Sequence, residues 1–410
     1  MTLKKINAWL HLWLGLDSGL IVFIVSITGC IYVFEKEIRS FYQPWQFVQP
    51  QEKSFLLPTQ LIDRAKPELG KLKPTSINYG QKNEAATVNS LNRKKGTSLV
   101  IYMNPYTAEI IHIDRKNKRS NADFFRFILN GHRTLWMGKT GSKIIGAGVL
   151  VFVVLLISGI VLWWPKKWIR SIRDQSFKIK WSGSFKRVNY DLHKVAGFYV
   201  FLVLLLISLT GLVYSYKWYS KSLYWVTSGG KSLEAKPRPL SDTTTNAVFQ
   251  QKNIDKIYSK LATTDQAAGM FITLPAKASD AIGFIVYLKA GTFYKADRYA
   301  FDQYTMKQFA GNSPLLGKYE DASIPDKIRR MNYDLHVGSV MGLPTKIIAF
   351  LASLISASLP VTGFLVWYGK KFKKKKEKKP LVQEKMILKK TTAPWKLKKI
   401  RTAAMQEPVV

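Results

Sequence analysis

The sequence predicts a membrane protein in which four transmembrane α-helices form two helix–ectodomain–helix repeats, each carrying a small α+β domain outside the membrane. Three observations predict this fold class. Four mostly apolar runs are long enough to cross a bilayer. A histidine stands at the start of each run, and the motifs around these histidines recur at fixed offsets. The segments that join or flank the runs are strongly basic on one side only. The runs cover residues 10–34, 144–164, 195–217 and 345–368.

The motif spacing shows that the chain is built from one unit used twice. His11 and His193 are each followed by a glycine after four residues and by a Ser-x-Thr-Gly group that ends eighteen residues on. His132 and His336 share another set of offsets, with glycine at 6 and 27, tryptophan at 31 and lysine at 34. The sequence NYDLH also occurs twice, ending at His193 and at His336. Each half therefore contains an outward span, an ectodomain and an inward span.

The charge distribution orients the spans. The net charge is +37, and Lys and Arg number 2 in residues 1–10, 8 in 165–187 and 15 in 370–410. Basic segments at the ends of spans are cytoplasmic, so we expect both termini and the 165–187 loop inside and the two ectodomains outside. The basic tail would also contact anionic membrane lipids. Because the charge is placed in this way, we expect no nucleic-acid partner.

Taken in order, the chain divides into eight segments. The expected order is the cytoplasmic N-terminus and first span (1–34), the first ectodomain (35–130), the second span (131–165), a basic loop (166–188), the third span (189–217), the second ectodomain (218–330), the fourth span (331–369) and a basic cytoplasmic tail (370–410). The first run resembles a signal peptide after Lys4 and Lys5, but it lacks a small-x-small cleavage site, which favours a retained anchor. The single cysteine, Cys30, excludes an internal disulfide.

The ectodomains each read as a helix followed by alternating strands. In the first, a helix starts at 58–64 and strand patterns follow at 74–80, 85–91, 98–104 and 108–113. In the second, a helical pattern near 247–262 precedes strand patterns at 269–275, 282–289 and 293–301. Corresponding turns read Asn-Pro-Tyr-Thr at 104–107 and Asp-Gln-Tyr-Thr at 302–305. In the tail, 394–400 is a candidate amphipathic piece.

Some positions need separate placement. A continuous helix from His132 to the end of the second span would be roughly 50 Å long, so we expect His132 at the outer interface, on a separate turn before Lys143. Asp17 lies within the first run and must face the bundle or a wet helix end. His112 follows the first hairpin and is expected at the surface.

The histidines occupy two depths. His11 and His193 both begin outward spans, and His132 and His336 both begin inward spans, so each pair faces across an approximate two-fold axis. Two imidazoles in this arrangement suit the two axial positions of a haem, while a transition-metal site and structural or proton-relay roles are the alternatives. Zinc is disfavoured because two ligands leave its tetrahedral shell unfilled.

Two glycines next to the inner pair support the haem interpretation. Gly15 and Gly197 lie one helical turn beyond His11 and His193, where the missing Cβ would let a porphyrin approach the backbone. Helix packing favours small residues for the same reason.

These motifs together resemble the PepSY-associated transmembrane family. The resemblance rests on HxxxG with SxTG in the first and third spans, HRxLWxG with SGxxLWWP in the second, and DLHxGxxxGLPxK with TGxxxW in the fourth. It implies a four-helix protein with two periplasmic PepSY-like domains and haem between the helices. Carried over by position, it implies that His11, His132, His193 and His336 are the haem-iron ligands.

The resemblance further implies an inner-membrane ferric-siderophore reductase, active in iron transport. We expect two haem groups per chain, one for each histidine pair. They would be haem b, because no CxxCH motif is present for covalent attachment. The electron donor would be a cytoplasmic protein, a small reductant or quinol, because no GxGxxG nucleotide-binding motif occurs. Ferric siderophore would bind near the outer pair, where the nearby residues are Arg126, Arg133, Arg329, Arg330 and Trp136.

Two other function classes remain open. The PepSY-like units could be binding or inhibitory modules on a membrane anchor, with no redox role for the helices. The protein could also transport the siderophore itself, although four helices would need an oligomer to line a path. Visible absorption of the purified protein distinguishes the redox class from both.

Overall fold

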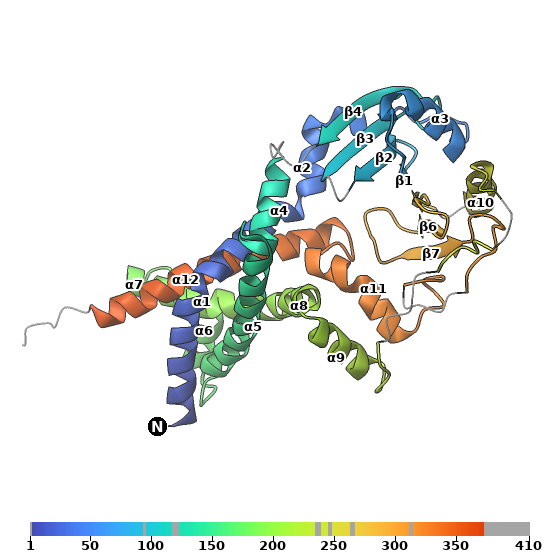
Figure 1. The fold of residues 1–410 in the computed structure, drawn as a ribbon. Helices are drawn as coiled ribbons and strands as arrows, with labels where there is room; N and C mark the ends of the chain where they lie inside the picture. Colours follow the sequence, from blue (N-terminus) through green and yellow to red (C-terminus); the bar gives the residue numbers. More distant parts are fainter. Residues whose placement is uncertain are drawn as a thin grey trace, which may run out of the picture. The chain divides into compact units, whose positions relative to one another are not determined.

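The structure is a computed structural model, and it describes residues 2–92, 96–116, 123–233, 239–244, 248–262, 267–310 and 315–372. Residues Met1–Trp367 form one compact unit, which contains the strands, three of the long helices and the fourth long helix up to Trp367 (Figure 1). Most of the basic tail, including the candidate amphipathic piece at 394–400, lies outside the described residues.

In the part of the chain that the structure describes, four helices are long and apolar enough to cross a membrane, as the sequence predicts. They are α1 (Leu3–Val33), α5 (Gly138–Trp163), a composite third span (Phe185–Ser215) and α12 (Leu343–Lys371). The third span consists of α7 (Phe185–Asp191), a π-helical turn (Leu192–Ala196) and α8 (Gly197–Ser215). His193 lies in the π turn, a local widening that is frequent at functional sites.

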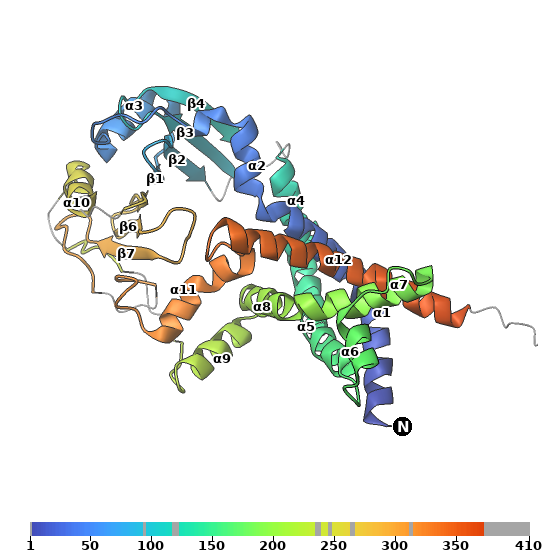
Figure 2. The same cartoon turned by 180° about the vertical axis from the view of Figure 1, so that it is seen from behind.

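The spans pack through apolar and small residues. Leu156 of α5, Val200 and Leu204 of α8 and Ala352 of α12 form a buried cluster where these three helices meet (Figure 2). Between α1 and α5 the contact is closer still, because a Cβ added to Gly148 would lie 2.8 Å from Ile21 Cγ2. Close approach of backbones through small residues is the usual basis of helix association in lipid.

A break in the backbone precedes each inward span. Helix α4 (Phe124–Thr134) ends where Leu135 and Trp136 take left-handed conformations, with φ of 46° and 57°. Helix α11 (Ile324–Val337) ends at Gly338, whose φ is 76°. His132 therefore lies on a separate helix before Lys143, as predicted from the length of the segment, and His336 lies in the corresponding place.

Between the spans, the two α+β domains share one antiparallel sheet. Its order is β4-β3-β2-β1-β5-β6-β7. The first domain supplies β1 (Ser76–Tyr79), β2 (Ala86–Asn92), β3 (Thr97–Met103) and β4 (Ile110–Lys116), and the second supplies β5 (Gly269–Thr273), β6 (Ile282–Tyr287) and β7 (Ala296–Phe301). These strands fall where alternation predicts them. Their union through β1 and β5 was not predicted.

The core of this sheet crosses the boundary between the domains. Ile77 of β1 pairs with Ile272 of β5, and both are fully buried. Helices α3 (Pro58–Leu69) and α10 (Lys252–Ala262) contribute buried side chains to the same cluster, including Leu61 and Ile254. The Thr59 amide donates to Asp255 Oδ1 over 3.0 Å and so links the two helices.

Shorter helices join the sheet to the spans. Helix α2 (Glu35–Tyr42) follows α1 and leads through the 3₁₀ turn Pro44–Gln46 toward the first domain, while α9 (Lys217–Thr227) follows α8 (Figure 1). The basic loop between the second and third spans contains α6 (Arg170–Phe177). Four transmembrane-length helices and an α+β region confirm the predicted fold class.

Candidate functional site

The structure brings the four span-associated histidines together in two pairs. The ring centroids of His11 and His193 lie 6.4 Å apart, and those of His132 and His336 lie 6.1 Å apart. Each pair joins one histidine from each half of the chain, as the repeat predicts. His11 is on α1, and the same helix contacts His132 at Gly29, eighteen residues further on. The two pairs are therefore separated by about 27 Å along α1.

At the pair formed by His11 and His193, each ring is held by a hydroxyl on a neighbouring span. His11 Nδ1 lies 2.7 Å from Ser158 Oγ of α5, and His193 Nδ1 lies 3.0 Å from Thr362 Oγ1 of α12. The Ser158 hydroxyl donates its proton to the Leu155 carbonyl, and the Thr362 hydroxyl donates to the Ser358 carbonyl. Both hydroxyls are therefore left to accept from the imidazole.

The other pair is held through carbonyls as well as hydroxyls. His132 Nδ1 is 2.9 Å from the Val25 carbonyl of α1, and His336 Nδ1 is 3.0 Å from the Ile207 carbonyl of α8. Two hydroxyls lie beside these contacts. Thr28 Oγ1 is 3.5 Å from His132 Nδ1, and Thr210 Oγ1 is 3.2 Å from His336 Nδ1. Because a carbonyl can only accept, Nδ1 carries the proton in both rings. In all four histidines Nε2 is then the nitrogen with a free lone pair, the form that ligates a metal.

A glycine follows each hydroxyl and makes room for the ring. A Cβ would lie 3.0 Å from His132 Cε1 at Gly29 and 3.2 Å from His336 Cε1 at Gly211. At Gly363 it would lie 3.2 Å from His193 Cε1, and at Gly159 3.4 Å from His11 Cε1. The first three separations are shorter than ordinary carbon contacts, and the one at Gly159 is at their lower limit. The repeated Ser/Thr-Gly dipeptide of each span is thus the cradle of a histidine that belongs to another span.

An asparagine four residues before the histidine completes three of the four cradles. Its side-chain amide donates to the carbonyl of the same serine or threonine. The contacts are Asn7 to Ser158 (3.1 Å), Asn189 to Thr362 (3.0 Å) and Asn332 to Thr210 (3.2 Å). The corresponding position before His132 is Ile128. We did not predict these asparagines, although their shared spacing from the histidines is visible in the sequence.

The two pairs fit the axial ligation of a haem iron. An imidazole nitrogen lies about 2 Å from the metal that it binds, so two rings on opposite sides of one ion have centroids about 6 Å apart. Both pairs meet this spacing. Among the described residues, no group of three or more His, Cys, Asp or Glu could hold a metal ion. If a haem were bound, the two histidines of each pair would hold its iron, and the four Nδ1 contacts would keep the imidazoles in the ligating tautomer.

Gly15 and Gly197 have a looser environment than the cradle glycines. A Cβ at Gly15 would lie 3.8 Å from Leu155 Cδ2, and one at Gly197 would lie 3.6 Å from Leu359 Cδ2. Both are ordinary van der Waals distances to side chains of neighbouring spans. Their role in admitting a porphyrin stays a prediction, whereas the glycines that contact the imidazoles are the ones in the Ser/Thr-Gly dipeptides.

The four arginines expected near the outer pair do not form a single exposed rim. Arg126 and Arg133 are exposed on α4, and Arg329 is half-buried on α11. Arg330 is only 6 % exposed, and its guanidinium donates to the Leu316 and Gly317 carbonyls. Arg330 is therefore removed from the predicted anion-binding set, because its donors already satisfy the backbone of the second domain.

The other singled-out residues lie apart from the histidine pairs. Trp136 stacks on Phe127 and donates from Nε1 to its carbonyl over 2.9 Å, so its ring folds back along α4. His112 stacks on Trp45 at a centroid distance of 4.0 Å on β4, half-buried rather than fully at the surface. Asp17 is exposed on α1.

Four long apolar helices with one α+β region define a class of membrane protein, and in this chain two histidine pairs lie between the helices. Residues 8–370 match the family described as the PepSY-associated TM region. Since this match covers most of the chain, the protein belongs to that family, which confirms the resemblance and the membrane class. Comparison with curated protein sequences gave no significant match.

Proposed function

We propose that this protein is a di-haem oxidoreductase that carries electrons across the membrane to ferric siderophore. The observation that supports it most strongly is the pair of histidine sites, each with two Nε2 lone pairs available and every Nδ1 held by a neighbouring span. Structural histidines have no need for this fourfold arrangement. Membership of the PepSY-associated family is consistent with the proposal.

In this proposal His11 and His193 hold one haem b, and His132 and His336 hold the other. A bound haem supplies a one-electron carrier whose potential depends on its axial ligands and burial. The chain's own contribution is to fix the rings: Ser158 and Thr362 orient the first pair, and the Val25 and Ile207 carbonyls orient the second. The separation of about 27 Å along α1 is close to the thickness of a bilayer core, so the sites would serve opposite faces.

The direction of transfer follows from the charge distribution. With the basic loop and tail inside the bacterial inner membrane, His11 and His193 lie at the cytoplasmic level and receive electrons from a cytoplasmic donor or quinol. His132 and His336 lie beneath the periplasmic α+β domains. Siderophores bind Fe(III) far more tightly than Fe(II), so one-electron reduction there releases iron.

Haem content and pairing are tested together by visible spectroscopy. We expect about two haems per chain in a pyridine haemochrome assay of protein expressed with ample haem. His11→Ala and His193→Ala should remove one spectral component, and His132→Ala and His336→Ala the other. His112→Ala is the matched control, because His112 stacks on Trp45 outside both pairs. A wild-type protein with clearly fewer than one haem would contradict the redox class and favour a non-redox binding module or a transporter.

Substrate reduction needs its own assay. Dithionite-reduced protein, freed of excess reductant, is mixed with ferric siderophore and a ferrous trap. We expect the haem to reoxidise and trapped Fe(II) to form, with the outer pair as the donor. Haem that stays reduced with hydroxamate, catecholate and carboxylate chelates, but is reoxidised by oxygen, would count against the reductase.

A further inference from the structure

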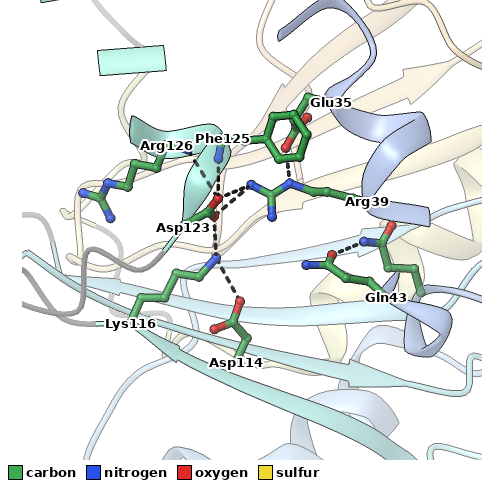
Figure 3. A network of polar contacts seen from close by, with 9 residues as sticks. Glu35, Arg39, Gln43, Asp114, Lys116, Asp123, Phe125 and Arg126 are labelled. Atoms are coloured by element: carbon green, nitrogen blue, oxygen red, sulfur yellow. Dashed lines mark hydrogen bonds and ion pairs between the residues drawn. The ribbon is translucent and has the colours of Figure 1, made fainter. Parts of the chain in front are cut away.

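An ion-pair network joins the first α+β domain to the helix that carries His132 (Figure 3). Arg39 of α2 donates through Nη2 to both carboxylate oxygens of Asp123, at 2.7 and 2.8 Å, and through Nε to Glu35. The Arg39 and Asp123 side chains are only 17 % and 15 % exposed. A bidentate pair sheltered in this way is held more firmly than an exposed surface pair.

Asp123 also begins helix α4. Its Oδ1 accepts from the Phe125 and Arg126 amides at 3.0 and 3.3 Å, which is an N-cap. Burial raises the pKa of Asp123, but the hydrogen bonds and charge of Arg39 outweigh it and leave the pKa lowered. Lys116 at the end of β4 bridges Asp123 (3.4 Å) and Asp114 (2.9 Å), so the sheet is tied to the same carboxylate.

The two connected segments meet again at His132. Helix α1, which leads into α2 and Arg39, supplies the Val25 carbonyl and Gly29 that hold the His132 ring. Helix α4, which begins at Asp123, carries His132 nine residues later. The segment from Val25 to Arg39 and the segment from Asp123 to His132 are thus fastened to each other at both ends. Arg39 Cζ lies 5.0 Å from the Phe125 ring centroid and fills the space between them.

In the described part of the second half, α9 and α11 are joined by hydrogen bonds and not by an ion pair: the Tyr224 hydroxyl donates to Asp326 Oδ1 at 3.0 Å, and Arg329 Nη1 donates to Ser220 Oγ at 3.3 Å. Nine residues before His336 stands Lys327 in place of Asp123, and ten residues after Gly211 stands Lys221 where Arg39 follows Gly29. Four residues before His336, the Asn332 amide donates to the Thr210 carbonyl, whereas Ile128 stands four residues before His132. The ion pair therefore occurs at the one histidine that lacks this asparagine.

We propose that Arg39 and Asp123, supported by Lys116, are positioning residues for His132: they fix helix α4 against α1 and α2 and thereby set the orientation of the His132 ring toward His336. The proposal rests on the proposed function only in that His132 would ligate the outer haem. The fixing of α4 itself is a property of the chain without any bound group.

The experiment compares Arg39→Gln, Asp123→Asn and Arg115→Gln in the full-length protein. Asparagine is a good N-cap, so Asp123→Asn removes the ion pair and keeps the cap. Arg115 is the matched control, because this β4 residue forms its ion pair with Glu68 of α3, at 3.1 Å, and not with Asp123. Two readouts are taken: amide hydrogen exchange across Phe125–Asn130, and the low-temperature spectrum and midpoint potential of each haem.

We expect α4 amides to exchange about tenfold faster in Arg39→Gln and Asp123→Asn, since a sheltered charge-assisted bond is lost. The spectrum and potential of the outer haem should shift while those of the inner haem stay as in the wild type, and Arg39→Lys should restore part of the change. Arg115→Gln should alter neither readout. Unchanged exchange and an unchanged outer-haem signature in Asp123→Asn would overturn the proposal, even if Arg39→Gln fails to fold. Faster α4 exchange in a protein that binds no haem would support the fixing of α4 while rejecting the proposed function.

Discussion

At the scale of residues, the direction of each hydroxyl proton determines the chemistry of the histidines. Thr362 and Ser158 give their protons to carbonyls of their own helices, so they accept from Nδ1–H. The same holds for Thr210, which donates to the Leu206 carbonyl. This leaves Nε2 as the unprotonated nitrogen of each ring. Short side chains at helix positions thus select the ligand tautomer.

Removing one of these hydroxyls should weaken the site that it supports. Thr362→Val keeps the shape of the side chain but leaves His193 Nδ1 without the 3.0 Å contact. Loss of the hydrogen-bond partner of a ligating imidazole costs about 10- to 100-fold in affinity, so we expect haem affinity to fall by this factor. Competition with apomyoglobin for haem measures the change. Thr210→Val should cost less, because His336 keeps the Ile207 carbonyl.

Thr227→Val is the matched control for this change. Its hydroxyl bonds to the Leu223 carbonyl within α9, as the Thr362 hydroxyl does within α12, and Thr227 faces no histidine. Equal losses of haem affinity in Thr227→Val and Thr362→Val would mean that the hydroxyl acts through helix stability and not through the imidazole.

The cradle glycines should tolerate alanine poorly. At Gly29 and Gly363 an added methyl would press on the His132 and His193 rings at 3.0 and 3.2 Å. Overpacking of this kind costs about 1–3 kcal/mol, and we expect each variant to lose the haem of its own site in the haemochrome assay. Gly15→Ala should retain both haems, because its methyl meets only Leu155 at 3.8 Å. Loss of the inner haem in Gly15→Ala would instead support close approach of a porphyrin at that glycine.

At the scale of elements, the pairing of β1 with β5 turns two small domains into one folded layer. Four register pairs join the strands, from Ser76 with Thr273 to Tyr79 with Met270. Small sheets are marginal alone, since they bury little apolar surface. Union through the central strands lets each domain complete the core of the other, and it leaves β4 and β7 as the outer strands.

Truncating the paired isoleucines should therefore destabilise both domains together. Ile77→Ala and Ile272→Ala each remove fully buried methyls and should cost about 2–5 kcal/mol of unfolding free energy. Because the residues are paired, the double variant should depart from additivity by about 0.5–3 kcal/mol. Denaturant unfolding in detergent, followed by circular dichroism, measures both. Leu91→Ala on β2, where the side chain is 47 % exposed, is the control. Strictly additive losses would show that the domains unfold independently.

At the scale of the whole molecule, duplication produces two sites from one design. Each span carries a Ser/Thr-Gly cradle, and each has a histidine either on the span itself or on the short helix before it. Each histidine uses the cradle of the other span in its own half. The two halves then meet at the imidazole pairs. Neither half can form a two-ligand site alone, so the site depends on the complete four-helix chain.

The predicted orientation can be tested by cysteine labelling in a Cys30→Ala background. Thr107→Cys and Lys289→Cys place exposed thiols on the first and second α+β domains, and Lys178→Cys places one in the basic loop. In spheroplasts, an impermeant maleimide should label the first two and leave the third unlabelled until the membrane is opened. If only Lys178→Cys were labelled, the predicted topology, and with it the proposed direction of electron flow, would be the wrong way round.

Much of this architecture is determined by the sequence alone. Apolar run length fixes the four spans, because lipid demands about twenty apolar residues for each crossing. Alternation fixes the strands, and repeated offsets identify the duplicated halves and the four histidines. The excessive length of the segment from His132 even predicts the break before Lys143. These are local properties, so local patterns are sufficient to read them.

Contacts between distant segments were decided only by the tertiary structure. No local pattern shows that Asn7 and His11 contact Ser158 and Gly159, or that β1 pairs with β5. These partners are far apart in the chain, so they meet only when the helices and strands pack together. The same reason explains why local patterns did not show that Arg330 donates to carbonyls of its own domain, or that the glycines after Ser or Thr contact the imidazoles. Motifs identify the four histidines, whereas packing between helices decides their hydrogen-bond partners and the ring nitrogen that is left free.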